Sequence, residues 1–230
     1  MRLICATLAA IVVAASPALS QGPAAIDPVA VSPDMYNVLL ENDYVRVVEY
    51  TIKPGERDRP HTHPPKVSYV LNGGSLRIAP DGAEAFVSDD ADGEVTFRGA
   101  VGRHTAENVG KTPVRIILFE VKRVDRPAAP HAEDPPVVNP MSVKVKLEND
   151  SVRVLEAVLP PGFKEKQHTH PPYATYVIDG GSVRMHLADG TTHDAELTPG
   201  QAIFSNPVTH WAENTGSSTL RLILVEVRHR

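Results

Sequence analysis

The sequence predicts an all-β protein made of two copies of one domain. Short apolar or alternating runs recur along the chain between Gly, Pro and Asn-Asp turn signals, and helical periodicity never lasts more than a few residues. Aromatic residues make up only 5% of the 230 residues, whereas there are 21 prolines and 15 glycines. Many short strands at regular spacing predict a sandwich or a small barrel.

The second half of the chain repeats the first. The matching segments are LENDYVRVVEYTIKPG (40–55) and LENDSVRVLEAVLPPG (147–162), HTHPP (61–65 and 168–172), SYVLNGGSLRI (68–78) and TYVIDGGSVRM (175–185), and HTAENVG (104–110) and HWAENTG (210–216). Copies of about 90 residues are too long to be solenoid units. We therefore expect two homologous domains, at 35–124 and 141–230.

The first twenty residues have the pattern of an export signal. A basic start at Arg2 is followed by an apolar run of about twelve residues and then by the small residues Ala18 and Ser20. We expect cleavage after Ser20 and a periplasmic or secreted protein. A membrane anchor is the weaker interpretation, because about 20 apolar residues are needed to span and this run stops at Pro17.

Two further segments are expected to be extended. Residues 125–140 contain five prolines, which argue against a regular helix or a central strand and favour a Pro-rich linker. Residues 21–34 form a similar extended leader. The one cysteine, Cys5, lies within the export signal, so the mature protein would have neither a disulfide nor a thiol nucleophile.

Within the first copy, five segments have the pattern of strands. They are Val45 to Ile52, Val67 to Leu71, Ser75 to Ile78, Val95 to Phe97 and Val114 to Lys122. Turn signals separate them, and corresponding signals recur in the second copy, at Pro161-Gly162, Gly180-Gly181, Asp189-Gly190 and Pro199-Gly200.

Six histidines fall at repeated positions. Residues two apart on a strand point the same way, so the two histidines of each HTH segment project together. A third imidazole from a distant strand would complete a facial site for a divalent transition metal. The predicted metal ligands are His61, His63 and His104 in domain 1 and His168, His170 and His210 in domain 2. Ordinary hydrogen-bonded histidines are the alternative, which two matched sets make less attractive.

These motifs resemble those of the cupin superfamily. Gly55 to His63 and Gly162 to His170 have the form G-x5-H-x-H, and H-x3-N follows at His104 to Asn108 and at His210 to Asn214. The chain thus resembles a bicupin over nearly all of residues 35–230. The resemblance implies two tandem antiparallel β-barrels of jelly-roll type. Cupin barrels often pair through exposed edge strands, so a homodimer is a further expectation.

The sequence departs from the family in one important way. Cupins usually have a glutamate ligand shortly after the second histidine, and here Ser68 and Thr175 occupy that position. Neutral ligands would leave a divalent ion its full charge, which favours chelating anions such as enolates, diketonates, hydroxy-acids and phenolates. Lys66 would repel the ion in domain 1. We therefore expect catalysis in domain 2, where Tyr173 or Thr175 would supply a proton or orient the substrate.

Four other repeated polar residues have a less specific pattern. Arg77 and Arg184 follow the Gly-Gly-Ser turns, and we expect them in salt bridges rather than on an anionic substrate. Glu107 and Glu213 alternate away from the third histidine of each set, which favours the surface or a position behind a ligand. The motifs contain no carboxylate that would serve as a general base.

The net charge of −5 and a pI near 6 argue against a nucleic-acid partner. The first hypothesis is an enzyme that uses iron, copper, nickel, manganese or zinc on a small oxygen-rich molecule. It would be dioxygenase-like, on a diketone, phenolic or hydroxy-acid, or an isomerase or lyase. The second is a non-catalytic periplasmic protein that binds metal or a small ligand. The third is a structural bicupin with remnant histidines, which the duplicated sets disfavour.

Overall fold

The computed structural model describes residues 25–122 and 133–227. The predicted export signal, residues 21–24 of the leader, residues 123–132, which include the first part of the predicted linker, and residues 228–230 lie outside this range. Within it, none of the helices has the length and apolar character needed to cross a membrane.

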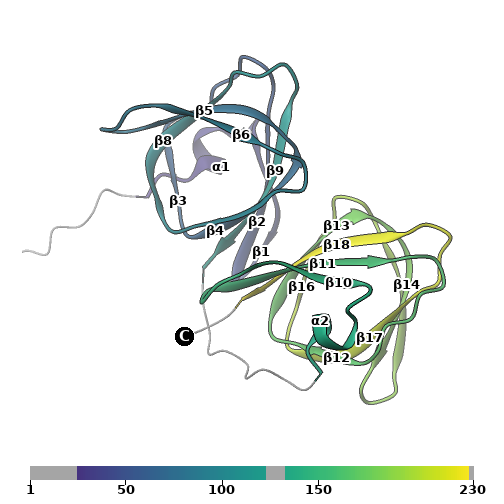
Figure 1. Cartoon of the computed structure of the whole chain (residues 1–230). Coiled ribbons are helices and arrows are strands. Elements are labelled where there is room, and N and C mark those ends of the chain that lie inside the picture. Colours follow the sequence, from purple (N-terminus) through teal and green to yellow (C-terminus); the bar gives the residue numbers. More distant parts are fainter. Residues whose placement is uncertain (1–24, 123–132, 228–230) are drawn as a thin grey trace, which may run out of the picture.

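The described residues form eighteen strands and two one-turn helices, in the same order in each half (Figure 1). The first half contains α1 (Pro28–Val31), β1 (Tyr36–Glu41), β2 (Val45–Ile52), β3 (His61–His63), β4 (Lys66–Asn72), β5 (Gly74–Pro80), β6 (Phe86–Asp90), β7 (Val95–Arg98), β8 (Val101–Asn108) and β9 (Val114–Val121). The second half contains α2 (Pro135–Val138), β10 (Val143–Glu148), β11 (Val152–Leu159), β12 (His168–His170), β13 (Tyr173–Asp179), β14 (Gly181–Leu187), β15 (Thr192–Leu197), β16 (Ala202–Ser205), β17 (Val208–Asn214) and β18 (Leu220–Val227).

Each half has one five-stranded and one four-stranded antiparallel sheet. The orders are β1-β2-β9-β4-β7 and β3-β8-β5-β6 in the first half, and β10-β11-β18-β13-β16 and β12-β17-β14-β15 in the second. The two sheets of a half face each other, and in the described residues they remain separate ladders. The predicted all-β, jelly-roll class is confirmed, as a sheet sandwich in each half.

The repeated LEND segment forms the same turn twice. The side-chain oxygen of Asn42 accepts hydrogen bonds from the backbone N–H groups of Tyr44, at 2.8 Å, and Val45, at 3.0 Å. Asn149 caps Ser151 and Val152 at the same distances. An asparagine that bonds its own following backbone favours a tight turn between two strands, so the motif is explained by chain geometry.

The sequence analysis expected an extended leader and an extended linker, but the structure shows that neither is wholly extended. Each contains a one-turn helix, α1 and α2, that begins at a proline after Asp27 or Asp134. Proline is favoured at the first helical position, because no hydrogen bond is lost there and its φ is preset. The preceding residues bind the HTH strands, since the N–H of Thr62 donates to Ile26 O at 2.9 Å and that of Thr169 donates to Glu133 O at 3.0 Å.

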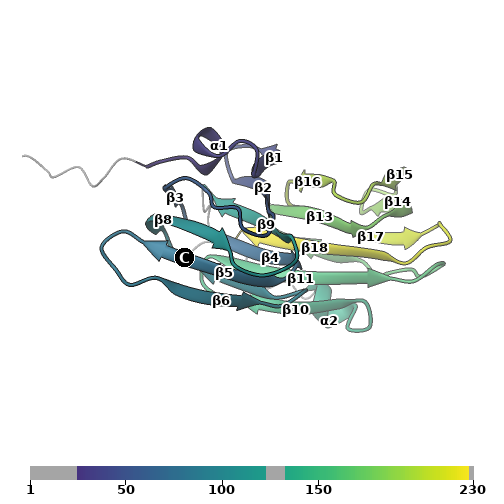
Figure 2. The ribbon, with the colours of Figure 1, turned by 90° about the horizontal axis from the view of Figure 1, so that it is seen from above.

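A hydrophobic core lies between the two halves, in addition to the core inside each half. The five-stranded sheets pack against each other through buried residues that include Val47 and Phe119 of the first half and Val154 and Ile223 of the second. The views in Figures 1 and 2 show the halves side by side, with these sheets adjacent. Strands β2, β9, β11 and β18 are therefore buried on both faces, which explains why their sequences are almost continuously apolar.

Candidate metal centres

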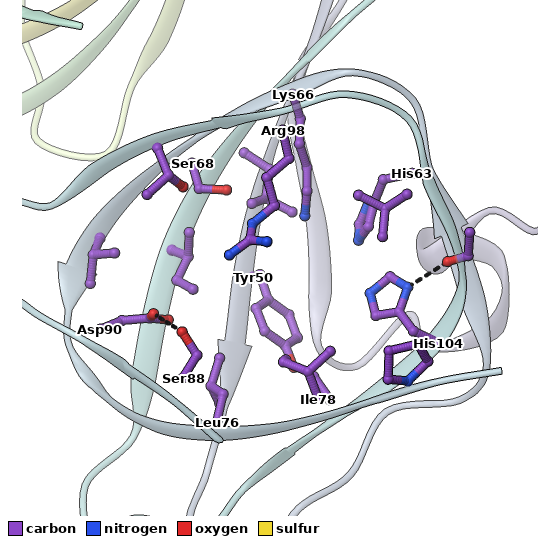
Figure 3. Close-up of a pocket in the computed structure, with 18 of the residues that line it drawn as sticks. Tyr50, His63, Lys66, Ser68, Leu76, Ile78, Ser88, Asp90, Arg98 and His104 are labelled. Carbon is purple, nitrogen blue, oxygen red and sulfur yellow. Dashed lines mark hydrogen bonds between the residues drawn. The ribbon is translucent and has the colours of Figure 1, made fainter. Parts of the chain in front are cut away.

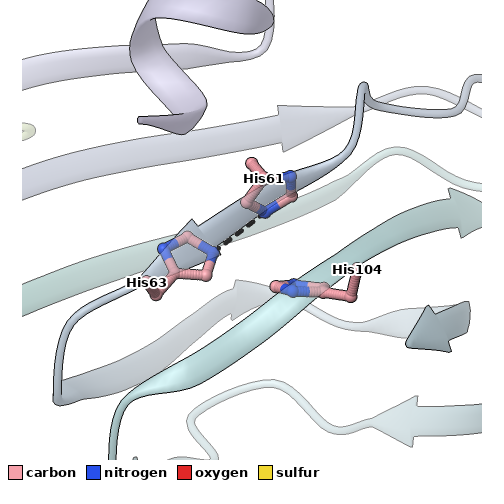
Figure 4. Close-up of side chains that lie close together, drawn as sticks. All are labelled: His61, His63 and His104. Atoms are coloured by element: carbon pink, nitrogen blue, oxygen red, sulfur yellow. Dashed lines mark hydrogen bonds between the residues drawn. The ribbon is translucent and has the colours of Figure 1, made fainter. Parts of the chain in front are cut away.

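The structure brings each predicted set of three histidines together. In strand β3, His61 and His63 are buried on one face while Thr62 between them points the other way. His104 of β8 lies directly across from His61. Figure 4 shows the three rings converging, and their ligand nitrogens lie within 4.8 Å of one another.

The second set has nearly the same geometry. His210 of β17 lies opposite His168 of β12, and the three ligand nitrogens again lie within 4.8 Å. The ring centroids of His168 are 4.9 Å from His170 and 4.6 Å from His210, compared with 4.7 Å and 4.4 Å for the matching rings of the first set. The sequence repeat therefore extends to side-chain geometry.

The conserved spacing G-x5-H-x-H and H-x3-N has a structural reason. Gly55 and Gly162 have φ of +77° and +75°, a left-handed conformation that favours glycine. Their N–H groups donate to the carbonyl oxygens of Asn108 and Asn214 at 2.9 Å, which ties the two motifs of each half together. Asn108 also caps the following turn, because its side-chain oxygen accepts from the Gly110 N–H at 2.9 Å.

Most of the imidazoles are oriented through Nδ1. This atom donates to a backbone carbonyl in His61 and His104, in each case at 2.8 Å, whereas in His168 it lies between Lys166 O, at 2.8 Å, and Asn139 Nδ2, at 3.0 Å. In His63 and His170 it donates to a buried glutamate instead. Nε2 is then left without a proton, so its lone pair is available to a metal.

The glutamates Glu120 and Glu226 were missed by the sequence analysis. Glu120 accepts from His63 Nδ1 at 3.0 Å and pairs with Arg46 at 2.6 Å, and Arg46 reaches Asp27 at 2.9 Å. Burial alone would raise the pKa of Glu120, but hydrogen bonds from His63 and Arg46 outweigh it and lower the pKa. The repeat contained a signal for these residues, because FEV (119–121) matches VEV (225–227) and the segment VRV occurs in both halves (45–47 and 152–154).

Three of the imidazoles are uncharged near neutral pH. Burial lowers the pKa of His63 to about 3, that of His168 to about 4 and that of His210 to about 3. Neutral imidazole is the form that binds metals. His210 also has both ring nitrogens buried without a hydrogen-bond partner among the described residues, which costs free energy unless one of them has a ligand.

A carboxylate lies beside each set, three residues before the first histidine. In the first half it is Asp58, which accepts hydrogen bonds from Ala106 N at 2.6 Å, Tyr36 Oη at 2.9 Å and Tyr50 Oη at 3.2 Å. The two tyrosine rings stack at 4.5 Å. Because three donors bind its carboxylate, Asp58 is not free to act as a general base.

The matching carboxylate of the second half is Glu165, and its surroundings differ. Val143 and Ala157 stand where the first half has the two tyrosines. Among the described residues, Glu165 accepts only from Ala212 N, at 3.3 Å, and its Oε2 lies 3.9 Å from His168 Nε2. Burial raises the pKa of Glu165 to about 7. The expectation that the motifs contain no carboxylate near the histidines is therefore wrong. The carboxylate lies before the first histidine of the G-x5-H-x-H segment, rather than after the second histidine.

Each set of histidines opens into a cavity between the two sheets of its half. The first cavity has a volume of about 650 Å³ and is lined by His63, His104, Lys66 and Ser68 among others (Figure 3). The second is smaller, about 240 Å³, and is mostly apolar.

The two residues predicted to be catalytic, Tyr173 and Thr175, line the second cavity together with its three histidines. The Tyr173 ring centroid lies 4.5 Å from that of His170. Burial raises the pKa of Tyr173, which keeps its hydroxyl protonated at neutral pH. Their catalytic role stays a prediction.

The other repeated polar residues point away from the histidines. Arg77 lies 3.8 Å from Glu107, and Arg184 lies 2.6 Å from Asp194, so both arginines form surface ion pairs as expected. Glu213 pairs with Lys164 at 3.0 Å. Trp211 stacks on His186 with centroids 3.4 Å apart and packs there, outside the cavity lining.

Comparison with solved structures finds the same architecture elsewhere. AerE from Microcystis aeruginosa has a TM-score of 0.60 at 13% identity, covering 84% of this chain and 97% of that one. An oxalate decarboxylase has a TM-score of 0.61 at 14% identity, covering 94% and 86%. Two sheet sandwiches in tandem, each with a buried set of three histidines, decide the question of fold. The chain has the bicupin fold.

Sequence comparison adds one curated relative of this chain. The polyketide synthase protein TcmJ of Streptomyces glaucescens is 32% identical over 97 residues, which are 42% of this chain and 63% of TcmJ. The match therefore spans less than two thirds of that relative. No family model matches the chain. Another neighbour, the oxalate decarboxylase of Bacillus subtilis, has Mn(II) centres, with a TM-score of 0.59 at 13% identity over 82% of this chain and 70% of that one.

The donor sets of the bicupin fit a divalent transition metal. Three neutral imidazoles converge in each half, and ligand nitrogens bound to one ion at about 2.1 Å would lie about 3 to 4 Å apart. His61 Nε2 and His63 Nε2 are 3.0 Å apart, within that range. Little rearrangement of the protein would therefore be needed to bind an ion.

Proposed function

We propose that the bicupin is a metal-dependent enzyme that acts on a small oxygen-rich molecule, in a dioxygenase-like reaction on a diketone, phenolic or hydroxy-acid. The observation that carries the proposal is the pair of buried three-histidine sets, each beside a cavity that its histidines help to line. A bound divalent ion would act as a Lewis acid toward a chelating oxygen ligand. A cavity of a few hundred Å³ excludes bulk water and holds a small organic molecule.

The residues of the chain have distinct roles in this proposal. His168, His170 and His210 hold the ion in the second half, and Glu226 fixes the orientation of His170. Tyr173 and Thr175 face the same cavity, where their hydroxyls can orient a substrate oxygen or give it a proton. His61, His63 and His104 form the equivalent metal site of the first half.

The comparisons support the class of metal and substrate without deciding them. The Mn(II) centres of the Bacillus subtilis oxalate decarboxylase favour manganese, and imidazole sites also suit iron, copper, nickel and zinc. TcmJ is a polyketide synthase protein, and polyketides carry diketone and phenolic groups of the proposed kind. With zinc, isomerase or lyase chemistry would replace oxygen chemistry, because zinc is not redox-active.

The alternative is a non-catalytic protein that binds metal or a small ligand. Asp58 favours it for the first half, because all its donors are internal and it is not free to serve as a base. Residues 1–20 support export, so we propose a periplasmic or secreted location for either function. A homodimer remains a proposal that size measurement would test.

Metal content of the purified protein tests the proposal. Elemental analysis without chelators should find two ions per chain, one lost in His61→Ala and the other in His168→Ala, while the exposed control His193→Ala keeps both. With a redox-active metal, oxygen uptake should follow the addition of a diketone, phenolic or hydroxy-acid. Failure to bind metal after reconstitution would overturn the enzyme proposal. Metal binding without turnover on any of these substrates would favour the binding protein.

A further inference from the structure

Two cations of the first cavity lie directly opposite each other without a partner. Lys66 of β4 is in register with Arg98 of β7, and both side chains line the cavity. Figure 3 shows the Arg98 guanidinium pointing into the cavity. Among the described residues, neither side chain has an ion pair or a hydrogen bond. Like charges directly opposite each other on a sheet are destabilising.

The nearby acid offsets part of this repulsion but forms no ion pair with Lys66 among the described residues. Glu120 is the other neighbour of Lys66 in the sheet, but its carboxylate is already bound to His63 and Arg46. Arg103 at the cavity wall is paired with Asp81 at 3.2 Å. Asp90 accepts from Ser88, and Figure 3 places both at the opposite end of the cavity from His104. The cations near the histidines are thus left for something that enters the cavity.

The second half shows that the fold does not require these cations. Tyr173 and Ser205 occupy the same paired positions, so the second half has no charged side chain there. The two halves share the LEND turn, the three histidines and the glutamate behind them, and differ at this pair. A charged pair that costs stability in one half alone indicates a requirement of that half's ligand.

The rest of the cavity wall is more apolar than polar, although Ser88, Asp90, Glu94 and Thr96 also line it. Its apolar part is formed by Tyr50, Val70, Leu76, Ile78, Phe86 and Leu118. The cavity volume of about 650 Å³ is well above what a two-carbon acid would fill and suits a ring-sized molecule. Only two prolines separate Lys66 from His63 in the sequence. An anionic group bound by the cations would therefore lie near the histidines, while an apolar body fills the remaining space.

We propose that the first half binds an organic anion with an apolar or aromatic body, whose acidic group is held by Lys66 and Arg98 next to the three histidines. The anion would neutralise the repulsion between the two cations and between them and a metal ion. The inference deepens the proposed function by naming the ligand class of the first site. It rests on that proposal only for the metal, because two cations can hold a carboxylate without one.

The test compares two probes of one shape and different charge. Isothermal titration calorimetry would measure 2-naphthoate and its neutral amide, 2-naphthamide, on the protein before and after EDTA treatment. We expect 2-naphthoate to bind in both states, at least tenfold more tightly than the amide. Lys66→Gln and Arg98→Gln should each weaken the binding of 2-naphthoate at least tenfold and leave the metal content unchanged. The surface variants Lys53→Gln and Arg77→Gln are matched controls that should bind like the wild type.

A stability measurement separates a ligand-binding pair from a structural one. Because the pair is repulsive when empty, Lys66→Gln should raise the Tm of the ligand-free protein, by about 2 °C or more. Equal affinity for the two probes, no binding of 2-naphthoate, or unchanged binding in both variants would each overturn the inference. Metal content is measured separately, so loss of the proposed metal function would leave anion binding intact and be recognised as a different failure.

Discussion

Glu226 accepts a hydrogen bond from Nδ1 of His170 at 2.7 Å, and the same carboxylate is bound by Arg153 at 2.6 Å. Arg153 continues to Asp134, 2.7 Å away, just before helix α2. The first half repeats this chain of contacts from His63 through Glu120 and Arg46 to Asp27. A buried carboxylate behind a metal-binding imidazole fixes its tautomer and orientation and makes its free nitrogen a better donor.

Replacing this carboxylate should weaken one metal site and leave the other intact. Glu226→Gln puts an amide beside His170 and Arg153, so the imidazole is no longer held by an anion. We expect the affinity of the second site for metal to fall about 10- to 100-fold, as measured by competition with a chelator. Glu120→Gln should have this effect on the first site instead. Glu213→Gln, an ion-paired glutamate outside both cavities, should affect neither, and a uniform loss in all three variants would contradict the assignment.

Asp58 should be a stability residue rather than a metal-site residue. It is buried and accepts three hydrogen bonds, so Asp58→Asn places an N–H₂ against donors and leaves at least one of them unsatisfied. We expect the free energy of unfolding to fall by about 2 to 4 kcal/mol in urea titrations of the chelator-treated protein. Glu84→Gln, on an exposed loop, is the control. If Asp58→Asn kept full stability but lost metal, the carboxylate would instead have to act at the ion.

The raised pKa of Glu165 predicts that part of the stability of the protein depends on pH. Its pKa is raised to about 7 from a usual value of 4.5, so the folded protein holds a proton that the unfolded chain releases in this window. Stability contributed by the bound proton is present below about pH 4.5 and is lost as the pH rises to about 7. At about 1.4 kcal/mol for each pH unit, the loss is about 3 kcal/mol.

Glu165→Gln should remove this loss. The difference in unfolding free energy between the variant and the wild type, both metal-free, should therefore grow in favour of the variant as the pH rises from 4.5 to 7.5. Subtracting the two curves removes the contribution of the buried histidines, which titrate in both proteins. Glu196→Gln, on an exposed strand, should run parallel to the wild type. A pH-independent difference for Glu165→Gln would show that its carboxyl ionises normally.

Much of the fold could be predicted because the sequence of one domain is repeated in the chain. The strands Val45 to Ile52 and Val114 to Val121 were visible as apolar runs, and the histidine sets followed from their matched spacing. The same comparison of halves would have found Glu120 and Glu226, but a charged residue inside an apolar strand carries no spacing rule that links it to a distant histidine. Their partnership exists only through the pairing of sheets.

Other features depended on replacements that the motif comparison passed over. The different fates of Asp58 and Glu165 are set by Tyr36 and Tyr50, which lie far upstream in sequence and are replaced by small apolar residues in the second half. Lys66 was taken as a reason to discount the first site. Its register with Arg98, on which the proposed anion site rests, requires knowledge of which strands are neighbours.

The shared core between the halves predicts that they unfold together. Phe119 has no exposed surface and belongs to a buried cluster that also contains Val154 and Ile223 of the other half. Phe119→Ala should destabilise the protein by about 3 to 5 kcal/mol.

Trp211, the one tryptophan, lies in the second half and reports on that half alone. In urea, with chelator present, its fluorescence midpoint should move down in Phe119→Ala together with the circular dichroism signal. The exposed Phe86→Ala should shift neither. If the halves were independent, Phe119→Ala would give an early dichroism transition while the Trp211 midpoint stayed where it is in the wild type, and the apolar faces of the five-stranded sheets would have to be stable in water.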